Sequence, residues 1–254
     1  MKNAPTNHPV DVQNPQGSSR VVVVCEHASH FIPDEFDGLG LTGDALKSHV
    51  AWDPGAMGVA RGVSQRLDAS LVSSTVSRLV YDCNRPPTAL DAMPAISEVF
   101  DVPGNANLTP EARKIRADTY YEPFRAGLAT TLSSKNEPVI VTVHSFTPVY
   151  NGQTRSVEIG VLHDSDARLA DAMLNNTAAC ERYDVQRNEP YGPEHGVTHT
   201  LIEHALGAKR LNVMLEIRSD LIQTEADQDA MAQGIASWVS DALHDLNTTG
   251  EPQC

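Results

Sequence analysis

The sequence predicts an α/β fold, in which helices pack on a mostly parallel β-sheet. Short runs of β-branched residues alternate along the chain with longer segments of helical periodicity, which is the pattern of βαβ units. Some of these runs also lack the polar alternation of a half-exposed strand, as in the four consecutive valines 21–24. Such runs are typical of strands that are buried on both faces of the sheet.

The 254 residues are enough for one large or two small domains, and we find no linker that divides them. We expect a single catalytic α/β domain over residues 20–247. Residues 1–19 are rich in Asn, Pro, Gln and Ser, so we expect a flexible leader there. We also expect residues 248–254 to form a frayed tail.

The apolar runs indicate strands, and the segments of helical periodicity indicate helices. The expected strands are 21–25, 69–75, 79–81, 138–143, 157–162 and 211–217. The expected helices are 53 to about 67, 109–132, 166–175, part of 194–206, and 224–246. Two of these helices have clear start signals, because Asp53 and Thr109 each precede a proline. The proline-rich segment 82–107 is expected to be a long functional or mobile loop.

Charge and composition exclude several classes of protein. The formal net charge of −14 argues against a nucleic-acid binder, because phosphates require a basic face. A local cluster of arginines could still bind a small anion. No apolar run approaches the length of a membrane helix, and the first 20 residues have no apolar signal region. The four cysteines form no CxxC pair, so we expect a cytoplasmic protein with reduced thiols.

Three expected strands end in acidic or imidazole side chains. These are Glu26 and His27 after the first strand, His144 after the fourth, and Glu216 near the end of the last. Because parallel strands share one carboxyl edge, the three ends could converge there, where open α/β sheets bind ligands. A single histidine after a strand is usually structural, but three such ends favour a functional site.

His and Asp are ligands of catalytic zinc, which keeps three protein ligands and one open position. The candidates are His27, Asp53 and His144, with Glu26 and His30 as alternatives for completing the site. Asp53 has a competing explanation as the helix N-cap. No local spacing is diagnostic of a metal site, and the metal identity stays open.

Two further groups of residues have a functional and a structural interpretation. Cys25 lies beside His27 and could act as a nucleophile, but its place inside the apolar run favours a buried, inert thiol. Arg78, Arg85 and Arg218 could bind carboxylates through their guanidinium forks, or could form ordinary ion pairs. The segments 191–193 and 195–196 are expected to be a loop near the pocket or a plain turn.

Several of these residues fall in blocks that, in this order, resemble the N-formylglutamate amidohydrolase family over about residues 21–235. The blocks are Cys25-Glu26-His27-Ala28-Ser29, Trp52-Asp53, Ser77-Arg78 with Asp82-Cys83-Asn84-Arg85-Pro86, His144-Ser145-Phe146-Thr147-Pro148, and Glu216-Ile217-Arg218-Ser219-Asp220-Leu221-Ile222. The first block departs from the Pro-His-Ser-Gly pattern of members that act in histidine breakdown. The second block, Val50-Ala51-Trp52-Asp53-Pro54, differs from their Asp-Thr-Asp-Trp-His. The chain therefore resembles a divergent branch of the family.

The resemblance implies a three-layer α/β sandwich with a mixed, mostly parallel sheet, similar to zinc-dependent exopeptidases. It implies hydrolysis of N-formyl-L-glutamate to formate and L-glutamate, with one zinc ion as cofactor. By position, His27, Asp53 and His144 match the metal ligands, and Glu216 matches the general base. Arg85, Arg218 and, more weakly, Arg78 match binders of substrate carboxylates.

Asn84 flanks the arginines and is expected to contribute to substrate binding, and Ser145 is expected to orient His144 or contact substrate. The expected partner is a small anionic N-acyl amino acid, with no nucleic acid and no membrane, and the oligomeric state is left open. Two alternatives remain at this point. One is a deacylase or carboxypeptidase-like hydrolase acting on another acyl compound. The other is a non-catalytic protein that binds small anions.

Overall fold

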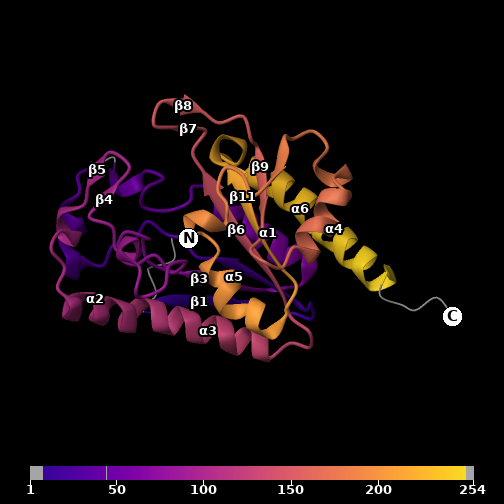
Figure 1. Cartoon of the computed structure of the whole chain (residues 1–254), viewed down its shortest axis with the longest axis horizontal. Helices are drawn as coiled ribbons and strands as arrows, with labels where there is room; N and C mark the ends of the chain where they lie inside the picture. The colour runs from indigo at the N-terminus through magenta and orange to yellow at the C-terminus, as the bar shows by residue number, and fades with distance from the viewer. Residues whose placement is uncertain (1–7, 44, 250–254) are drawn as a thin grey trace.

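The computed structural model describes residues 8–43 and 45–249, and it has a central sheet between two layers of helices (Figure 1). The sheet has seven strands in the order β1-β3-β2-β6-β11-β9-β10. Their bounds are β1 Val10–Gln13, β2 Val21–Cys25, β3 Ser70–Ser74, β6 Val139–Phe146, β9 Ile159–Leu162, β10 Val185–Arg187 and β11 Asn212–Arg218. Strands β3, β2, β6 and β11 are mutually parallel. At the margins, β1 is antiparallel to β3 and β9 is antiparallel to β11.

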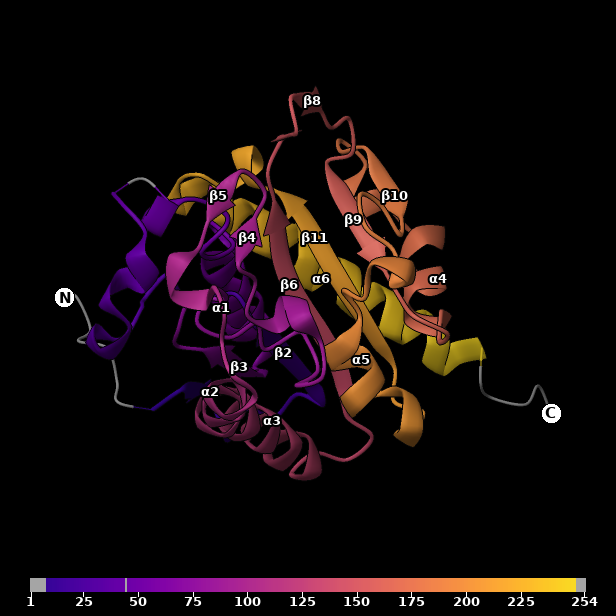
Figure 2. The same cartoon turned by 60° about the vertical axis from the view of Figure 1, so that its left-hand side comes forward.

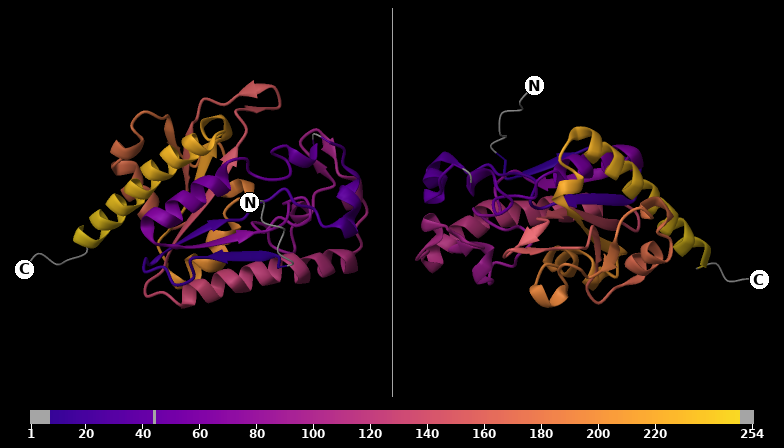
Figure 3. Two further views of the ribbon diagram at one scale, coloured as in Figure 1. Left: turned by 180° about the vertical axis from the view of Figure 1, so that it is seen from behind. Right: turned by 90° about the horizontal axis from the view of Figure 1, so that it is seen from above.

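Helices cover both faces of the sheet, as Figures 2 and 3 show. One face is covered by α1 (Ala56–Leu67), α4 (Arg168–Asn175) and α6 (Glu225–Thr249). The other face is covered by α3 (Glu122–Ser133), which continues from α2 (Pro110–Arg116), and by α5 (His199–His204). The fold is thus a three-layer α/β sandwich with a mixed, mostly parallel sheet, as predicted.

The all-valine run of β2 is explained by these two layers. Val21, Val23 and Cys25 belong to the core cluster on the side of α1 and α6, whereas Val22 and Val24 belong to the cluster on the side of α3. Successive side chains of a strand point to opposite faces, so a strand that is covered on both sides needs apolar residues at every position. All five residues of β2 are buried.

Most expected elements are present with small changes at their ends. The helix expected from residue 109 begins at Pro110, with Thr109 as its N-cap. The helix expected from Asp53 begins later, at Ala56, and its N-cap is Gly55. Gly55 has a φ of +84°, and a Cβ at this position would lie 2.4 Å from the carbonyl oxygen of Ile222. Only glycine fits such a left-handed, crowded turn.

Three expectations about local structure need correction. Within the expected leader, residues 10–13 form the edge strand β1, because Val10 and Val12 pack on the core while the backbone pairs with β3. Residues 79–81 form a turn and not a strand, since the N–H groups of Val80 and Tyr81 donate to the carbonyl of Ser77. Of the expected tail, residues 248–249 continue α6, and residues 250–254 lie outside the described part of the chain.

The irregular segment 82–107 contains the short hairpin β4 (Ile96–Ser97) and β5 (Phe100–Asp101). A second hairpin, β7 (Val149–Tyr150) and β8 (Gln153–Thr154), follows β6. Both project from the end of the sheet at which the central strands terminate (Figure 2). Within residues 8–43 and 45–249, no helix is both long and apolar enough to span a membrane.

Candidate metal centre

The predicted residues of three strand ends meet in one buried cluster. His27 lies in the turn after β2, His144 lies in β6, and Glu216 lies opposite His144 in the register of β11. Asp53 joins them from the turn before α1, where its backbone N–H donates to the carbonyl oxygen of His27. The four side chains belong to residues that are at most 6% exposed. The strand ends therefore converge as predicted.

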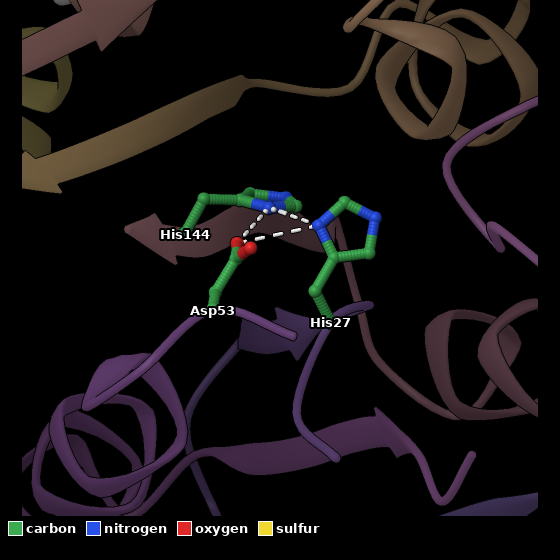
Figure 4. A group of neighbouring side chains, drawn as sticks. All are labelled: His27, Asp53 and His144. Atoms are coloured by element: carbon green, nitrogen blue, oxygen red, sulfur yellow. Dashed lines mark hydrogen bonds and ion pairs between the residues drawn. The ribbon is translucent and has the colours of Figure 1, made fainter. Parts of the chain in front are cut away.

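His27, Asp53 and His144 direct three ligand atoms at one point (Figure 4). Asp53 Oδ2 lies 3.3 Å from His27 Nδ1 and 2.9 Å from His144 Nδ1. The two Nδ1 atoms are 3.2 Å apart. With metal–ligand bonds of about 2.0–2.2 Å, two ligand atoms of a tetrahedral site lie about 3.4 Å apart. The observed separations are close to this value, so the donor set fits a divalent metal ion.

The outer nitrogens of both imidazoles face carboxylates. His27 Nε2 is 2.7 Å from Asp82 Oδ1. His144 Nε2 is 3.1 Å from Glu26 Oε2, which is an ion-pair distance without the alignment of a hydrogen bond. Histidines that bind a metal usually present the second ring nitrogen to a carboxylate or carbonyl, which fixes the tautomer and the ring orientation. This arrangement leaves both Nδ1 atoms free to act as ligands.

The charges of the cluster also match a divalent cation. Asp53, Asp82 and Glu26 are buried, and Arg78 is the guanidinium that bridges Asp53 Oδ1 and Asp82 Oδ2 at 3.3 and 3.1 Å. With neutral imidazoles, three carboxylates and one guanidinium leave a net charge of −2, before Glu216 is counted. Such a buried excess of charge is costly unless a cation compensates it.

The pKa shifts reflect the same imbalance. Burial by itself lowers the pKa of His144, but the carboxylates of Glu26 and Asp53 outweigh it, and the net pKa is raised well above the usual value. The pKa of His27 is likewise raised by Asp82 and Asp53 against burial and Arg78. Burial acts to raise the pKa of Asp53, but the two imidazoles outweigh it and lower the pKa. The shifts of all three groups thus have the same cause, which is the excess of buried negative charge around the two imidazoles.

Glu216 behaves differently from the other acids. Burial and the nearby charge of Asp53 raise its pKa to about 7, against the opposing effects of His144, His27 and Arg78. A carboxyl group with a pKa near the working pH can both accept and return a proton. Perturbed carboxyl groups of this kind concentrate at functional sites.

A cavity of about 250 Å³ opens beside the cluster. Of the predicted site residues, all but Arg218 line it: His27, Asp53, Arg78, Asn84, Arg85, His144, Ser145 and Glu216. Arg218 is held instead by Glu158 and Asp220, at 3.2 and 2.8 Å. Ser145 donates its backbone N–H to Asp53 Oδ2 and its hydroxyl to the carbonyl of Pro54, so it orients the aspartate.

The geometry bears on several alternatives from the sequence. The carboxylate of Asp53 caps no helix and points at the two histidines. Glu26 lies behind His144, and the ring of His30 packs 4.9 Å from Trp52, so neither belongs to the three-ligand group. Cys25 is fully buried, and burial together with nearby carboxylates raises its pKa. It is therefore a buried thiol, as the sequence indicates.

Four contributors to the site were not predicted in their observed roles. Asp82 orients His27, and Glu26 faces His144. His49 Nε2 and Glu98 Oε2 lie 2.8 Å apart on the cavity wall. His49 comes from the loop before Asp53, and Glu98 comes from the turn of the β4–β5 hairpin. Asp82 and Glu26 carried a signal, because each lies in one of the sequence blocks, whereas His49 and Glu98 carried none. Tyr191 and His195, from the expected pocket loop, do line the cavity.

Comparisons with known proteins agree with this description. Residues 19–223 match the family model described as N-formylglutamate amidohydrolase. The gene product Atu2144 of Agrobacterium tumefaciens shares 49% sequence identity over 94% of this chain and 96% of its own, with a TM-score of 0.92. The N-formylglutamate amidohydrolase of Ralstonia eutropha JMP134 shares 18% identity over 94% and 97% of the two chains, with a TM-score of 0.62, and supports the fold alone. No curated protein matches the sequence significantly.

Proposed function

Since the chain belongs to the N-formylglutamate amidohydrolase family, we propose that it hydrolyses the amide bond of an N-formyl amino acid with one divalent metal ion, zinc in the first instance. The observation that carries the proposal is the convergence of two Nδ1 atoms and one carboxylate oxygen within 3.3 Å of one another. The model reaction is that of N-formyl-L-glutamate and water, which gives formate and L-glutamate.

His27, Asp53 and His144 would hold the ion. When bound, zinc supplies Lewis acidity, which polarises the acyl oxygen and lowers the pKa of a water molecule towards ~7. Asp82 and Glu26 keep the imidazole rings in the orientation that presents Nδ1. Arg78 compensates the charge of two of the carboxylates.

Glu216 is the proposed general base. Its carboxylate takes a proton from the attacking water and later delivers it to the nitrogen of the leaving amine. Its place beside His144 and its raised pKa support both steps. Ser145 holds Asp53, and Arg78, Asn84 and Arg85 form the part of the cavity where the amino acid would bind.

Metal analysis of purified variants tests the proposed site. His27→Ala and His144→Ala are expected to lose the metal that the unchanged protein binds, whereas Cys25→Ala should retain it. If both histidine variants keep stoichiometric metal, the assignment is wrong. Hydrolysis of N-formyl, N-acetyl and N-carbamoyl amino acids is then measured with and without a chelator. Turnover that the chelator does not affect would refute metal dependence.

A further inference from the structure

The cavity lining has few free hydrogen-bond donors for the second carboxylate of a dicarboxylate substrate. A guanidinium has five N–H groups. Arg85 donates four hydrogen bonds, one to the carboxylate of Asp91 and three to the backbone carbonyls of Asn84, His195 and Gly196. Arg85 therefore joins two loops of the cavity wall. A substrate carboxylate would have to displace these acceptors, at the expense of the bonds already made.

The other two arginines that the sequence singles out lead to the same conclusion. Arg218 lies outside the cavity lining, and Glu158, Asp220 and two backbone carbonyls accept its hydrogen bonds. Arg78 lines the cavity and donates one hydrogen bond from each terminal nitrogen, one to Asp53 and one to Asp82. It thus keeps further N–H groups for one carboxylate. Among the described residues, Arg78 and Arg85 are the arginines that line this cavity, and no lysine lines it. Arg155 lies outside the lining, where it stacks on the ring of Tyr191 and donates to the carbonyl of Thr147.

The wall of the cavity also contains an acid. Glu98 sits in the turn of the β4–β5 hairpin, with its side chain 17% exposed, and one of its oxygens is 2.8 Å from His49 Nε2. A carboxylate has lone pairs on both oxygens, so Glu98 can accept from a ligand while it keeps His49. A ligand carboxylate near Glu98 would be repelled, whereas an N–H donor would gain a charge-assisted hydrogen bond.

We infer that the substrate carries a single carboxylate, bound at Arg78, and a neutral side chain with a hydrogen-bond donor, such as a carboxamide, which faces Glu98. The inference rests on the proposed function and narrows its substrate class. N-Formyl-L-glutamine has this chemistry. N-Formyl-L-glutamate has nearly the same shape, but it presents a second negative charge in place of the amide donor.

The test compares kcat/KM of the metal-loaded protein for these two compounds. We expect the glutamine compound to be hydrolysed with a kcat/KM at least about tenfold higher, because the two differ in one charge near an acid. A smaller ratio, or a preference for the glutamate compound, overturns the inference while leaving the proposed function intact. If neither these compounds nor other N-formyl amino acids are hydrolysed, the proposed function itself fails.

A pair of variants tests the assignment to Glu98. Glu98→Gln removes the negative charge and is expected to reduce the preference for glutamine over glutamate about tenfold. Asp101→Asn removes the same charge from the same hairpin, outside the cavity lining, and should leave the preference unchanged. If the two variants show the same preference as the unchanged protein, Glu98 does not determine specificity and the inference is refuted.

Discussion

Asp82→Asn is expected to weaken metal binding about tenfold to a hundredfold without unfolding the protein. Asp82 Oδ1 lies 2.7 Å from His27 Nε2 and accepts from the N–H of Asn84 at 2.9 Å. Its other oxygen pairs with Arg78 at 3.1 Å. An asparagine that keeps its oxygen towards His27 turns its NH₂ group towards Arg78, so a donor meets a donor.

The magnitude follows from these contacts. A charge-assisted hydrogen bond is roughly twice as strong as a neutral one, so the bond to His27 loses about 1–1.5 kcal/mol. About 1.4 kcal/mol corresponds to a tenfold change in affinity. Arg78 keeps Asp53 but loses the charge of its second carboxylate partner, so more of its positive charge is uncompensated beside the ion and the affinity falls further.

The assay is a competition titration against a chromophoric chelator at fixed pH, with thermal unfolding of the metal-free protein to check the fold. The matched control is Asp91→Asn, because Asp91 also accepts from an arginine in the same segment but contacts no imidazole. If Asp82→Asn binds the metal as tightly as Asp91→Asn does, the proposed orienting role of Asp82 is refuted.

Three further predictions test the base, the core and the backbone. Glu216→Gln should retain the metal and lose about 10²–10⁴-fold in kcat; full activity would exclude Glu216 as the base. Burial lowers the pKa of His204 to about 4, against about 6.5 when unfolded. The unfolded state therefore binds more protons below pH ~6.5, and the free energy of unfolding should fall by up to about 3 kcal/mol as the pH drops to ~4. Denaturant titrations should show a weaker pH dependence in His204→Gln, and an unchanged one would contradict this reasoning. Gly55→Ala should destabilise the protein more than Gly152→Ala, since both have positive φ but only Gly55 also meets Ile222. Both variants carry the backbone strain of about 1–2 kcal/mol, so the difference between them measures the steric contact. Equal losses in the free energy of unfolding would refute the role of that contact.

The sequence predicts the centre of the fold better than its margins. The sequence predicts a buried strand at residues 21–25, because a strand that is covered on both faces has no polar position. β1 has no such signal: its four residues are only partly buried, and they form the edge of the sheet by backbone pairing with β3. β10 is a three-residue strand of the same kind. The antiparallel direction of β9 depends on its contact with β11, which is a long-range choice that local pattern does not encode.

The three proposed metal ligands are predictable because each adjoins a recognisable element. His27 and His144 come at the ends of apolar runs, and Asp53 precedes Pro54 at a helix start. Their orienting partners were harder to predict. Asp82 lies in an irregular segment 55 positions from His27, and no period or spacing connects two residues that meet only in the folded chain.

Glu26 shows how the register of the sheet explains an acid that the sequence left unassigned. Val24 pairs with Thr142 in the parallel ladder of β2 and β6, so two residues further on, Glu26 comes level with His144. Paired residues of neighbouring strands point to the same face, and this places the carboxylate at the outer nitrogen of the ring. His27 is one position further, beyond the end of β2, and the turn redirects it to the opposite side of the same ring. Glu26 is also where the first block departs from the proline of the resembled pattern. A proline has no side-chain acceptor, so the divergence replaces an inert position by an anion directly behind a proposed metal ligand.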